Sequence, residues 1–406
     1  MKKLETDVLI VGAGISGTVA ALNCAKAGKS VIVVEKLQKI GGQNNKKIDI
    51  TENLGLDEIF DELHLPHLGR FNKSVWYSPS CKFEFLSKVY DYYILRGSSP
   101  KSFDVQVAKM AKENGAIFFT DSVIVGSEKV SETECAVKIK KRDEIISISA
   151  KFIIGADGLT SQSLSIFGFD KFDVKGPNLI GYGGICHNIN LNSGETHVLF
   201  DANLAPGGYF YIGKTESGIG LASVVVNSKM QNGKSMKKIY ENFCEKNAHV
   251  KEMMKDHTLE NIFVGSGKLN LLKKRVIGNV ALVGDAGRTM DPIFGYGVRQ
   301  AIISGYVASK YVINSLDIGN NLLHNYELDL QNGLLKDENY GRLIRKVIDR
   351  ANNAELNHIF ETISYLHNTH GIDQLMEDIL LVPRFLSHSF RKDPVIFMSL
   401  FRKALF

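Results

Sequence analysis

The sequence predicts an α/β fold: a Rossmann-like domain with an inserted antiparallel-sheet domain, followed by a helical C-terminal region. Short β-branched runs such as Val8–Val11 and Val31–Val34 precede glycines or an acidic residue, as in buried parallel strands. From about 178 to 267 the segments alternate between apolar and polar residues, which is typical of an antiparallel sheet. Beyond about Asn321 the apolar residues recur at helical spacing.

The bulk composition limits the kinds of protein that this chain can be. A chain of 406 residues, 44% hydrophobic and 23% charged, fits two or three packed subdomains and excludes wholesale disorder. The net charge of +5 identifies no nucleic-acid partner, but it suits an anionic lipid surface or a phosphate-bearing substrate.

The five cysteines form no C-x-x-C pair, which argues against a zinc site and a disulfide framework and favours a reducing compartment. We therefore predict no metal site. The first apolar run ends at Gly12, which is too soon for a membrane-spanning helix, and no cleavage site follows it. We expect a cytoplasmic protein and leave peripheral contact with a membrane open.

The changes of pattern along the chain predict its division into domains. We assign residues 1–75, 100–175 and 268–320 to a cofactor-binding domain, 76–99 and 176–267 to a substrate domain, and 321–406 to the helical C-terminal region. Within these units we expect helices at Ile15–Ala27, Leu54–Leu65, Asp104–Asn114 and Gly297–Ile313, and a hairpin at Ala136–Ser149.

The first motif is Gly12-Ala13-Gly14-Ile15-Ser16-Gly17, between a predicted strand and a predicted helix. Its glycines permit a tight turn, close approach of a pyrophosphate and close packing of helix on strand, while the helix N-terminus favours the negative charge. Glu35 ends the next strand, 18 positions after Gly17, and its carboxylate suits a ribose 2′-hydroxyl. The site should prefer FAD or NAD over NADP; a glycine-rich turn without a ligand is the alternative. The candidate contacts here are Gly12, Gly14, Ile15, Ser16, Gly17, Glu35 and Lys36.

The second motif is Gly155-Ala156-Asp157-Gly158, which follows the apolar run Lys151–Ile154. Asp157 thereby stands at the carboxyl end of a strand, where open α/β sheets bind their ligands. Taken alone, the motif is equally typical of an ordinary Asp-Gly turn.

The third motif is Gly284-Asp285-Ala286-Gly287, which again follows a buried strand and continues through a glycine-rich loop to a helix. Asp285 can accept a hydrogen bond from a ribityl hydroxyl, Gly295 and Gly297 let the backbone approach a flavin ring, and the helix N-terminus can stabilise a reduced flavin. A loop without a ligand would not need all of these together. The candidate contacts here are Gly284, Asp285, Pro292, Gly295, Gly297 and Val298.

In their order, the three motifs resemble the para-hydroxybenzoate-hydroxylase-like FAD superfamily, over the chain up to about Leu316. The resemblance implies FAD as the cofactor of an oxidoreductase. Arg96, before Gly97 and Phe103-Asp104, is similar to the arginine with which this family reaches its cofactor; a surface arginine is the alternative. We also count Val123 among the cofactor contacts.

The stretch Pro206–Lys214 resembles the Tyr-x-Trp-x-Phe-Pro-Lys signature of the geranylgeranyl reductase family. Tyr209 matches the signature, Tyr211 stands at its tryptophan, and Gly213-Lys214-Thr215 replace Phe-Pro-Lys. Many members carry Cys-Gly-Gly near Gly41–Asn45, where this chain has no cysteine, so a cysteine-assisted step there is excluded. Tyr209 and Tyr211 should share one face of a strand and could line an apolar tunnel; ordinary strand packing is the alternative.

This second resemblance implies an FAD-dependent reductase that saturates geranylgeranyl-type double bonds of a membrane lipid precursor by flavin hydride transfer. The partners it implies are an isoprenoid lipid and an electron donor that the sequence does not identify. The catalytic residues are likewise not identified, since no proton donor is evident; ordered water or a tyrosine near the flavin is the hypothesis.

Two other functions stay open. Asp291–Val298 resembles the flavin-side loop of flavin halogenases, which keeps an oxygen-using monooxygenase or halogenase in view, although the single tryptophan, Trp76, excludes the Trp-x-Trp-x-Ile-Pro segment of halogenases. A flavin-bearing lipid carrier without turnover is the other.

The tail Arg384–Phe406 mixes basic and aromatic residues, which fits an anionic membrane surface or a C-terminal helix packed on the core.

Overall fold

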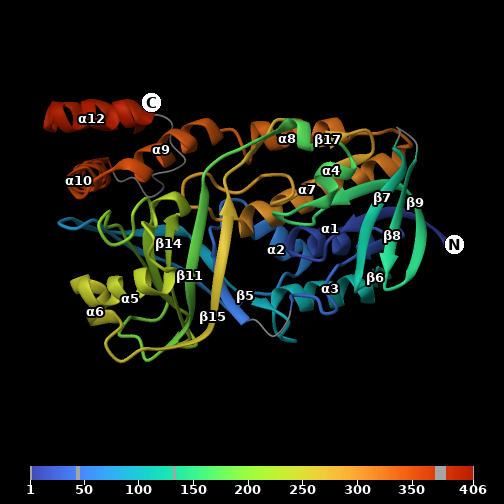
Figure 1. The fold of residues 1–406 in the computed structure, drawn as a ribbon, viewed down its shortest axis with the longest axis horizontal. Coiled ribbons are helices and arrows are strands. Elements are labelled where there is room, and N and C mark those ends of the chain that lie inside the picture. Colours follow the sequence, from blue (N-terminus) through green and yellow to red (C-terminus); the bar gives the residue numbers. More distant parts are fainter. Residues whose placement is uncertain (1, 43–45, 131–133, 371–380, 406) are drawn as a thin grey trace.

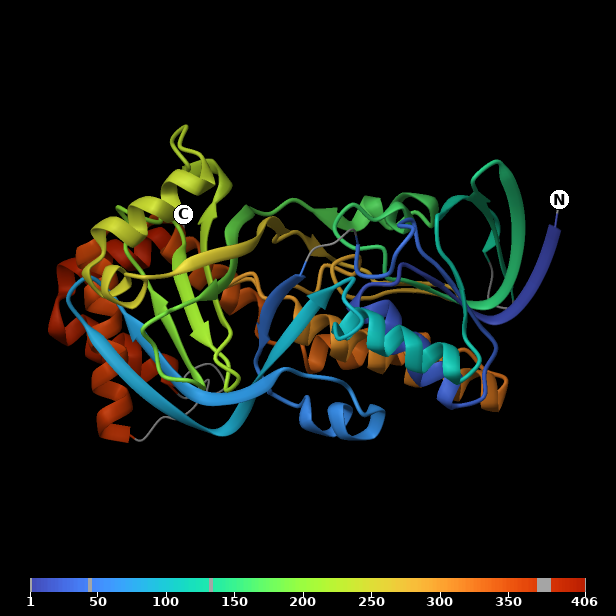
Figure 2. The same cartoon turned by 90° about the horizontal axis from the view of Figure 1, so that it is seen from below.

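The computed structural model describes residues 2–42, 46–130, 134–370 and 381–405. Two eight-stranded sheets, here called sheet A and sheet B, form two lobes that lie side by side along the long axis (Figure 1). The last helices of the chain cover sheet B at the end of the molecule away from the N-terminus (Figure 2). This architecture confirms the predicted fold class.

Sheet A contains the predicted parallel strands, in the order β17-β18-β9-β1-β2-β6, with the β7–β8 hairpin joined to β9. The pairs β1–β2, β1–β9, β9–β18 and β2–β6 are all parallel. The strands are β1 (Lys2–Val11), β2 (Val31–Val34), β6 (Ile117–Phe119), β7 (Ser122–Val130), β8 (Cys135–Lys141), β9 (Glu144–Gly155), β17 (Val276–Ile277) and β18 (Val280–Leu282).

Both faces of sheet A are covered, which explains its nearly continuous apolar strands. Val8 and Ile10 of β1 pack under helices α1, α3, α7 and α8, whereas Leu9 and Val11 face the β7–β9 hairpin region and α4. These helices are α1 (Ile15–Lys26), α3 (Phe103–Glu113), α4 (Gln162–Ile166), α7 (Val298–Ile318) and α8 (Leu323–Asn332).

Sheet B is antiparallel except for one parallel pair, β4–β12, and has the order β15-β11-β14-β13-β12-β4-β5-β3. Its strands are β3 (Lys46–Thr51), β4 (Gly69–Tyr77), β5 (Lys82–Gly97), β11 (Asn178–His187), β12 (Glu195–Leu199), β13 (Tyr209–Lys214), β14 (Gly220–Asn227) and β15 (Thr258–Lys268). A short two-stranded sheet pairs β10 (Asp173–Val174) with β16 (Leu271–Leu272).

Strand pairing places two segments of the expected 1–75 unit in the other lobe. β3 pairs antiparallel with β5, and β4 pairs with both β5 and β12, so both belong to sheet B. A strand's partner depends on contacts distant in sequence, which local alternation does not reveal. The expected helix Leu54–Leu65 is the shorter α2 (Asp57–Leu63), which ends at His64 with a left-handed φ of 55°.

The C-terminal region is helical, as predicted, and is anchored on the junction of the two lobes. It comprises α9 (Glu338–Arg350), α10 (Asn353–His370), α11 (Leu381–Lys392) and α12 (Pro394–Leu405), while α5 (Met236–Lys246) and α6 (Ala248–Met253) cover the opposite face of sheet B. Arg345 of α9 is buried and donates hydrogen bonds to the carbonyls of Ile293, at 2.7 Å, and Gly207, at 2.5 Å. One guanidinium thereby ties this region to a loop of each lobe.

Candidate cofactor and active site

The three predicted motifs meet at one edge of sheet A. Val11 pairs in register with Val34 on one side and Gly155 on the other, and Gly155 pairs with Leu282. Because these strands are parallel, the segments that follow them leave the sheet at the same edge. The sequence motifs, far apart along the chain, therefore form one site.

Contact between the motifs is close enough to require glycine. A Cβ atom on Gly12, whose φ is +106°, would lie 2.4 Å from the carbonyl oxygen of Ala156. A Cβ atom on Gly17 would lie 2.0 Å from the carbonyl oxygen of Gly12, and one on Gly284 would lie 2.7 Å from Oγ of Ser16. Both the second and third motifs thus pack directly on the first.

Gly14 differs, because a Cβ atom there would have no heavy atom within 4 Å apart from its immediate neighbours. It stands at the N-terminus of α1 with an extended backbone, so neither packing nor conformation explains a glycine. Close approach of a ligand to the backbone does. The first turn of α1 also contains no acidic residue, which leaves its free N–H groups available to an anion.

Glu35, which we predicted to accept a ribose hydroxyl, also has a structural role. The side chain is buried, and its two carboxylate oxygens accept the N–H groups of Ala13, at 2.7 Å, and Leu37, at 2.9 Å. Each carboxylate oxygen has a second lone pair, so the group can still accept ribose hydroxyls. The N–H of Ser122 donates to the Glu35 carbonyl at 3.0 Å, which brings the partly buried Val123 beside this corner, while Lys36 is exposed.

Asp157 is occupied by local contacts. One carboxylate oxygen accepts the hydroxyl of Ser161 at 2.6 Å, and the other accepts the N–H of Ser163 at 2.9 Å, so Asp157 helps to begin α4. The backbone of this segment, rather than the carboxylate, contacts Gly12. A cofactor contact by Asp157 stays a prediction.

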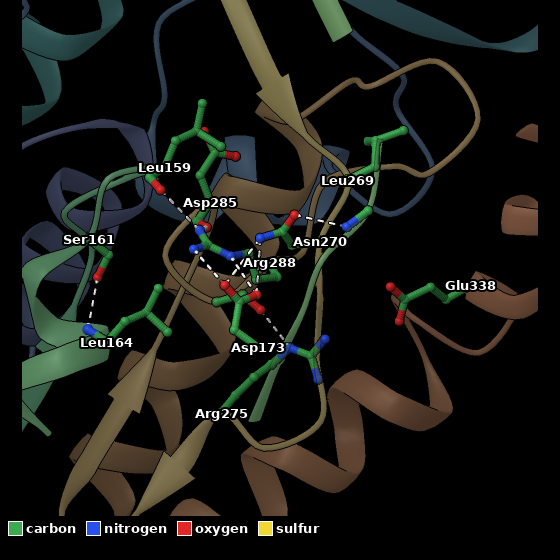
Figure 3. Close-up of polar contacts among 12 residues, drawn as sticks. Leu159, Ser161, Leu164, Asp173, Leu269, Asn270, Arg275, Asp285, Arg288 and Glu338 are labelled. Atoms are coloured by element: carbon green, nitrogen blue, oxygen red, sulfur yellow. Dashed lines mark hydrogen bonds and ion pairs between the residues drawn. The ribbon is translucent and has the colours of Figure 1, made fainter. Parts of the chain in front are cut away.

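Asp285 is held in place by Arg288, a residue that the sequence did not single out (Figure 3). The Arg288 guanidinium is buried and donates to the Asp285 carbonyl at 2.8 Å and to the Leu159 carbonyl at 3.3 Å, and it pairs with Asp173 at 3.3 Å. It therefore joins the second motif to the third. Burial raises the pKa of the Asp285 carboxyl, and Arg96 and Lys47 oppose that shift.

Arg96 is not a surface arginine. Its Nε and one terminal nitrogen each donate to the Asp104 carboxylate at 2.8 Å, and the other terminal nitrogen donates to Asp49 at 3.3 Å. Burial would raise the pKa of Asp49, but Lys47 and Arg96 hold it below its usual range. The guanidinium contributes positive charge next to Asp285, and direct contact with the cofactor stays a prediction.

The loop formed by residues 291–297, here the 291–297 loop, leads into α7 and contains Pro292, Gly295 and Gly297, with Val298 beginning the helix. Asp291 organises it by accepting the N–H groups of Ile293, at 3.1 Å, and Phe294, at 2.6 Å. Gly295 has a φ of +77°, and a Cβ atom there would lie 2.7 Å from the Leu179 side chain. The loop connects sheet A with sheet B through these contacts.

Tyr209 and Tyr211 share one face of β13, as predicted. Both belong to an aromatic cluster on the inner face of sheet B, whereas Phe210 packs under α5 on the other face. The Tyr209 hydroxyl donates to the Phe294 carbonyl of the 291–297 loop at 2.7 Å. The buried Tyr211 hydroxyl has no hydrogen-bond partner among the described residues, which is rare for a buried polar atom and marks a place for a ligand or water.

Aromatic rings surround the 291–297 loop on its sheet B side. Phe294 makes edge contacts with Trp76 at 5.4 Å and Tyr209 at 5.7 Å between ring centroids, and it stacks on Tyr296 at 5.5 Å. The result is an apolar wall directly beside the loop expected to hold a flavin.

Three carboxyl groups that were not expected as site residues lie beside this wall: Glu52 after β3, Asp91 on β5, and Asp291 of the 291–297 loop. Burial is the largest cause that raises each pKa, to about 8 for Glu52 and to about 6 for Asp91 and Asp291. Asp291 further raises the pKa of Glu52, and Arg299 of α7 opposes it. Asp91 lies within β5 and Asp291 in a loop, so no local sequence pattern groups them with Glu52.

The Gly41–Asn45 segment, near which many geranylgeranyl reductases carry Cys-Gly-Gly, is described only in part. Gly41 and Gly42 are described, with left-handed φ values of +80° and +89°, whereas residues 43–45 lie outside the described residues. A Cβ atom on Gly41 would lie 2.0 Å from the Gly97 carbonyl oxygen, so this turn packs against the residue after Arg96.

Comparison with protein families decides the cofactor. Residues 5–329 match the model of the FAD-binding domain family. The chain belongs to this family. Its cofactor is FAD, as predicted, and the protein is an FAD-dependent oxidoreductase. The open approach to Gly14, the free lone pairs of Glu35 and the position of Asp285 fit the pyrophosphate, ribose and ribityl groups of FAD in turn.

Relatives confirm the resemblance to geranylgeranyl reductases. The chain is 25% identical to the digeranylgeranylglycerophospholipid reductase of Methanocella arvoryzae, covering 91% of this chain and 93% of that protein. It is 27% identical to the protein of the same name from Thermoplasma acidophilum, covering 80% and 83%, and 26% identical to that of Thermoplasma volcanium, covering 93% of both.

Solved structures share the fold. A geranylgeranyl bacteriochlorophyll reductase-like protein of Thermoplasma acidophilum superimposes with a TM-score of 0.77 at 19% identity, covering 99% of this chain and 100% of that one. A flavin-dependent brominase superimposes with a TM-score of 0.69 at 18% identity, covering 91% of each chain.

Replacing Gly14 should separate cofactor binding from folding. For Gly14→Ala we expect the stability of the FAD-free protein to fall by no more than about 1 kcal/mol, because the methyl group meets no protein atom and alanine is only a poorer N-cap than glycine. We expect FAD affinity to weaken by ~10-fold or more, about 1.4 kcal/mol. Thermal unfolding of the FAD-free protein and FAD titration would measure the two effects. Gly69→Ala, where a Cβ atom also meets no heavy atom within 4 Å, is the matched control and should change neither. A Gly14→Ala protein that binds FAD normally would contradict this assignment.

Removing the hydroxyl should affect stability differently at the two tyrosines. Tyr209→Phe leaves the Phe294 carbonyl without its donor and should cost about 1 kcal/mol. Tyr211→Phe removes a buried hydroxyl that has no protein partner and should be neutral or stabilising. Chemical denaturation of both variants measures the difference, and an equal loss of stability would contradict the hydrogen-bond assignment.

Proposed function

We propose that this FAD-dependent oxidoreductase reduces the isoprenoid double bonds of a lipid, with geranylgeranyl chains of a membrane lipid precursor as the substrate. The observation that supports it best is the match to proteins named digeranylgeranylglycerophospholipid reductase over 93% of both this chain and a relative. The aromatic wall beside the 291–297 loop adds independent support, because an isoprenoid chain binds to apolar surface.

The two lobes would have different roles, one binding the cofactor and the other the substrate. Sheet A and its loops hold the cofactor, which when bound in its reduced form supplies a hydride. The face of β13 with Tyr209 and Tyr211 and the rings of Trp76 and Phe294 exclude water and align the alkene. The electron donor that reduces the cofactor would come from outside the chain.

The substrate itself provides the most direct test. Protein carrying FAD, reduced with dithionite and kept without oxygen, should be reoxidised when a geranylgeranyl lipid is added, and mass spectrometry should show about two hydrogens gained per double bond. The saturated lipid is the control and should leave the flavin reduced. Absence of reoxidation with any polyprenyl lipid would instead favour a lipid carrier.

An oxygen-using enzyme is the second candidate, because a flavin-dependent brominase shares the fold over 91% of this chain. The Asp291–Val298 segment favours it too. Oxygen consumption that depends on substrate and reductant, with no saturation of the lipid under anaerobic conditions, would replace the reductase assignment.

We also propose that α11 and α12 contact an anionic membrane surface at its periphery. None of the described helices is long and apolar enough to cross a membrane. On α12, Val395, Met398 and Leu405 are exposed and follow helical spacing, with Val395 80% exposed. The exposed Arg391 and Arg402 lie on the same two helices, and each cation near an anionic surface contributes about 1 kcal/mol.

Vesicle binding tests this contact. Val395→Glu with Met398→Glu should reduce co-sedimentation with anionic phospholipid vesicles by about tenfold, since burial of two apolar side chains is lost. Val125→Glu, at an exposed apolar residue of the other lobe, is the control and should bind normally. Equal binding by both variants and the original protein would show that α12 does not contact the membrane.

A further inference from the structure

Glu52 lies at the junction of the two lobes. It follows β3 directly, and the residues after it are fixed on both sides. The N–H of Asn53 donates to Asp91 of β5 at 2.8 Å, and Nε of Arg299 in the first turn of α7 donates to the carbonyl of Leu54 at 3.1 Å. The backbone at Glu52 is therefore held between sheet B and the helix that begins at the 291–297 loop.

The groups that face Glu52 come from every neighbouring element. Asp291 and Asp91 act on it as negative charges and Arg299 as a positive one, while its own charge acts on the hydroxyls of Tyr209 and Tyr296. Ile48 and Ile50 of β3 pack in the same cluster as Tyr209, Tyr211 and Phe294. Glu52, two residues after Ile50, therefore stands at the edge of the aromatic wall.

An independent observation indicates that this space receives a ligand. The Tyr211 side chain is 7% exposed, and its hydroxyl has no partner among the described residues. Tyr211 belongs to the same aromatic cluster as Tyr209, Phe294 and Tyr296, against which the end of β3 packs. A buried polar atom in this position is satisfied when a ligand or water enters.

Glu52 differs from its acidic neighbours in having its carboxyl group uncommitted. Asp291 accepts two backbone N–H groups and Asp91 accepts one. In the part of the chain that the structure describes, no hydrogen bond or ion pair of the Glu52 carboxyl is found, and the side chain is partly buried. Burial, and then the charge of Asp291, raise its pKa to about 8, so it is protonated at neutral pH, as a general acid must be.

We propose that Glu52 is the proton donor of the reduction, placing its carboxylic proton on one alkene carbon while the other carbon receives the hydride. This proposal rests on the proposed function. The alkene π bond breaks and two C–H bonds form; the reduced FAD is oxidised by two electrons, and Glu52 is left as a carboxylate that regains its proton from solvent.

The neighbouring hydroxyls are weaker candidates for this role. Tyr209 commits its proton to the Phe294 carbonyl, and burial raises the pKa of its hydroxyl beyond its ordinary value. Burial likewise raises the pKa of Tyr211 and Tyr296, which makes each a poorer acid. The pKa of Asp91 and of Asp291 is raised only to about 6, so both are mostly ionised at pH 7, whereas Glu52, with a pKa of about 8, is mostly protonated.

The test compares Glu52→Gln with Glu58→Gln, a change at an exposed glutamate in the first turn of α2. Single-turnover reoxidation of the reduced flavin by a geranylgeranyl lipid should slow by about 10²–10⁴-fold in Glu52→Gln and stay normal in Glu58→Gln. The rate of the original protein should fall above a pH of about 8, and this fall should be absent from the residual activity of Glu52→Gln. A rate for Glu52→Gln within twofold of the original would overturn the proposal.

A second measurement does not need turnover. Because the folded-state pKa of Glu52 lies above the ordinary value of 4.5, the folded protein binds an extra proton between pH 4.5 and about 8, and stability should fall as pH rises through this range. Glu52→Gln should lack that part of the fall, and infrared spectroscopy should show one fewer protonated carboxyl at pH 7. If these titrations behave as expected but no lipid is reduced by the original protein, the proposed function fails and the proton-donor role fails with it, while the protonated state of Glu52 stands. An ionised Glu52 at pH 7 would contradict the proton-donor role of Glu52 but not the proposed function.

Discussion

The close contact between the backbone of Gly12 and that of Ala156 is the constraint on which the site depends. A side chain on Gly12 would collide with that carbonyl at 2.4 Å, and one on Gly17 would collide with Gly12 itself. These contacts bring β1 and β9 together at their carboxyl ends and fix where α1 begins. The free N–H groups at that helix N-terminus then face the space in which a pyrophosphate is most stable.

The two lobes are joined at the 291–297 loop. This loop follows the last strand of sheet A in the sequence, and it packs against residues of both lobes. Tyr209 reaches it from β13, and Arg345 reaches it from α9. Both side chains donate to carbonyls of the loop, so its shape depends on the sheet B lobe and on the C-terminal helices. A cofactor held on sheet A, as we propose, would lie next to the aromatic wall of sheet B, where an apolar substrate would be kept from water.

Burial of charge at this junction gives the site its chemical character. Removing a carboxyl group from water favours its neutral form, and a second carboxyl nearby favours it further. Asp49 shows the opposite result a short distance away, because Lys47 and Arg96 outweigh its burial. The pKa of Asp49, within β3, is therefore lowered, whereas that of Glu52, directly after the strand, is raised, as the proposed proton donor requires.

The sequence alone determined the α/β class, the three FAD motifs, the face shared by Tyr209 and Tyr211, and the family. These features are local, since a glycine fingerprint or a two-residue alternation is complete within a few positions. Only the tertiary structure decided that β3 and β4 join sheet B, that Arg288 links Asp173 to the Asp285 backbone, and that the charges of Asp91 and Asp291 act on Glu52. Strand partners and the pKa of a buried acid depend on groups brought together from distant parts of the chain, and no local pattern records which groups those are.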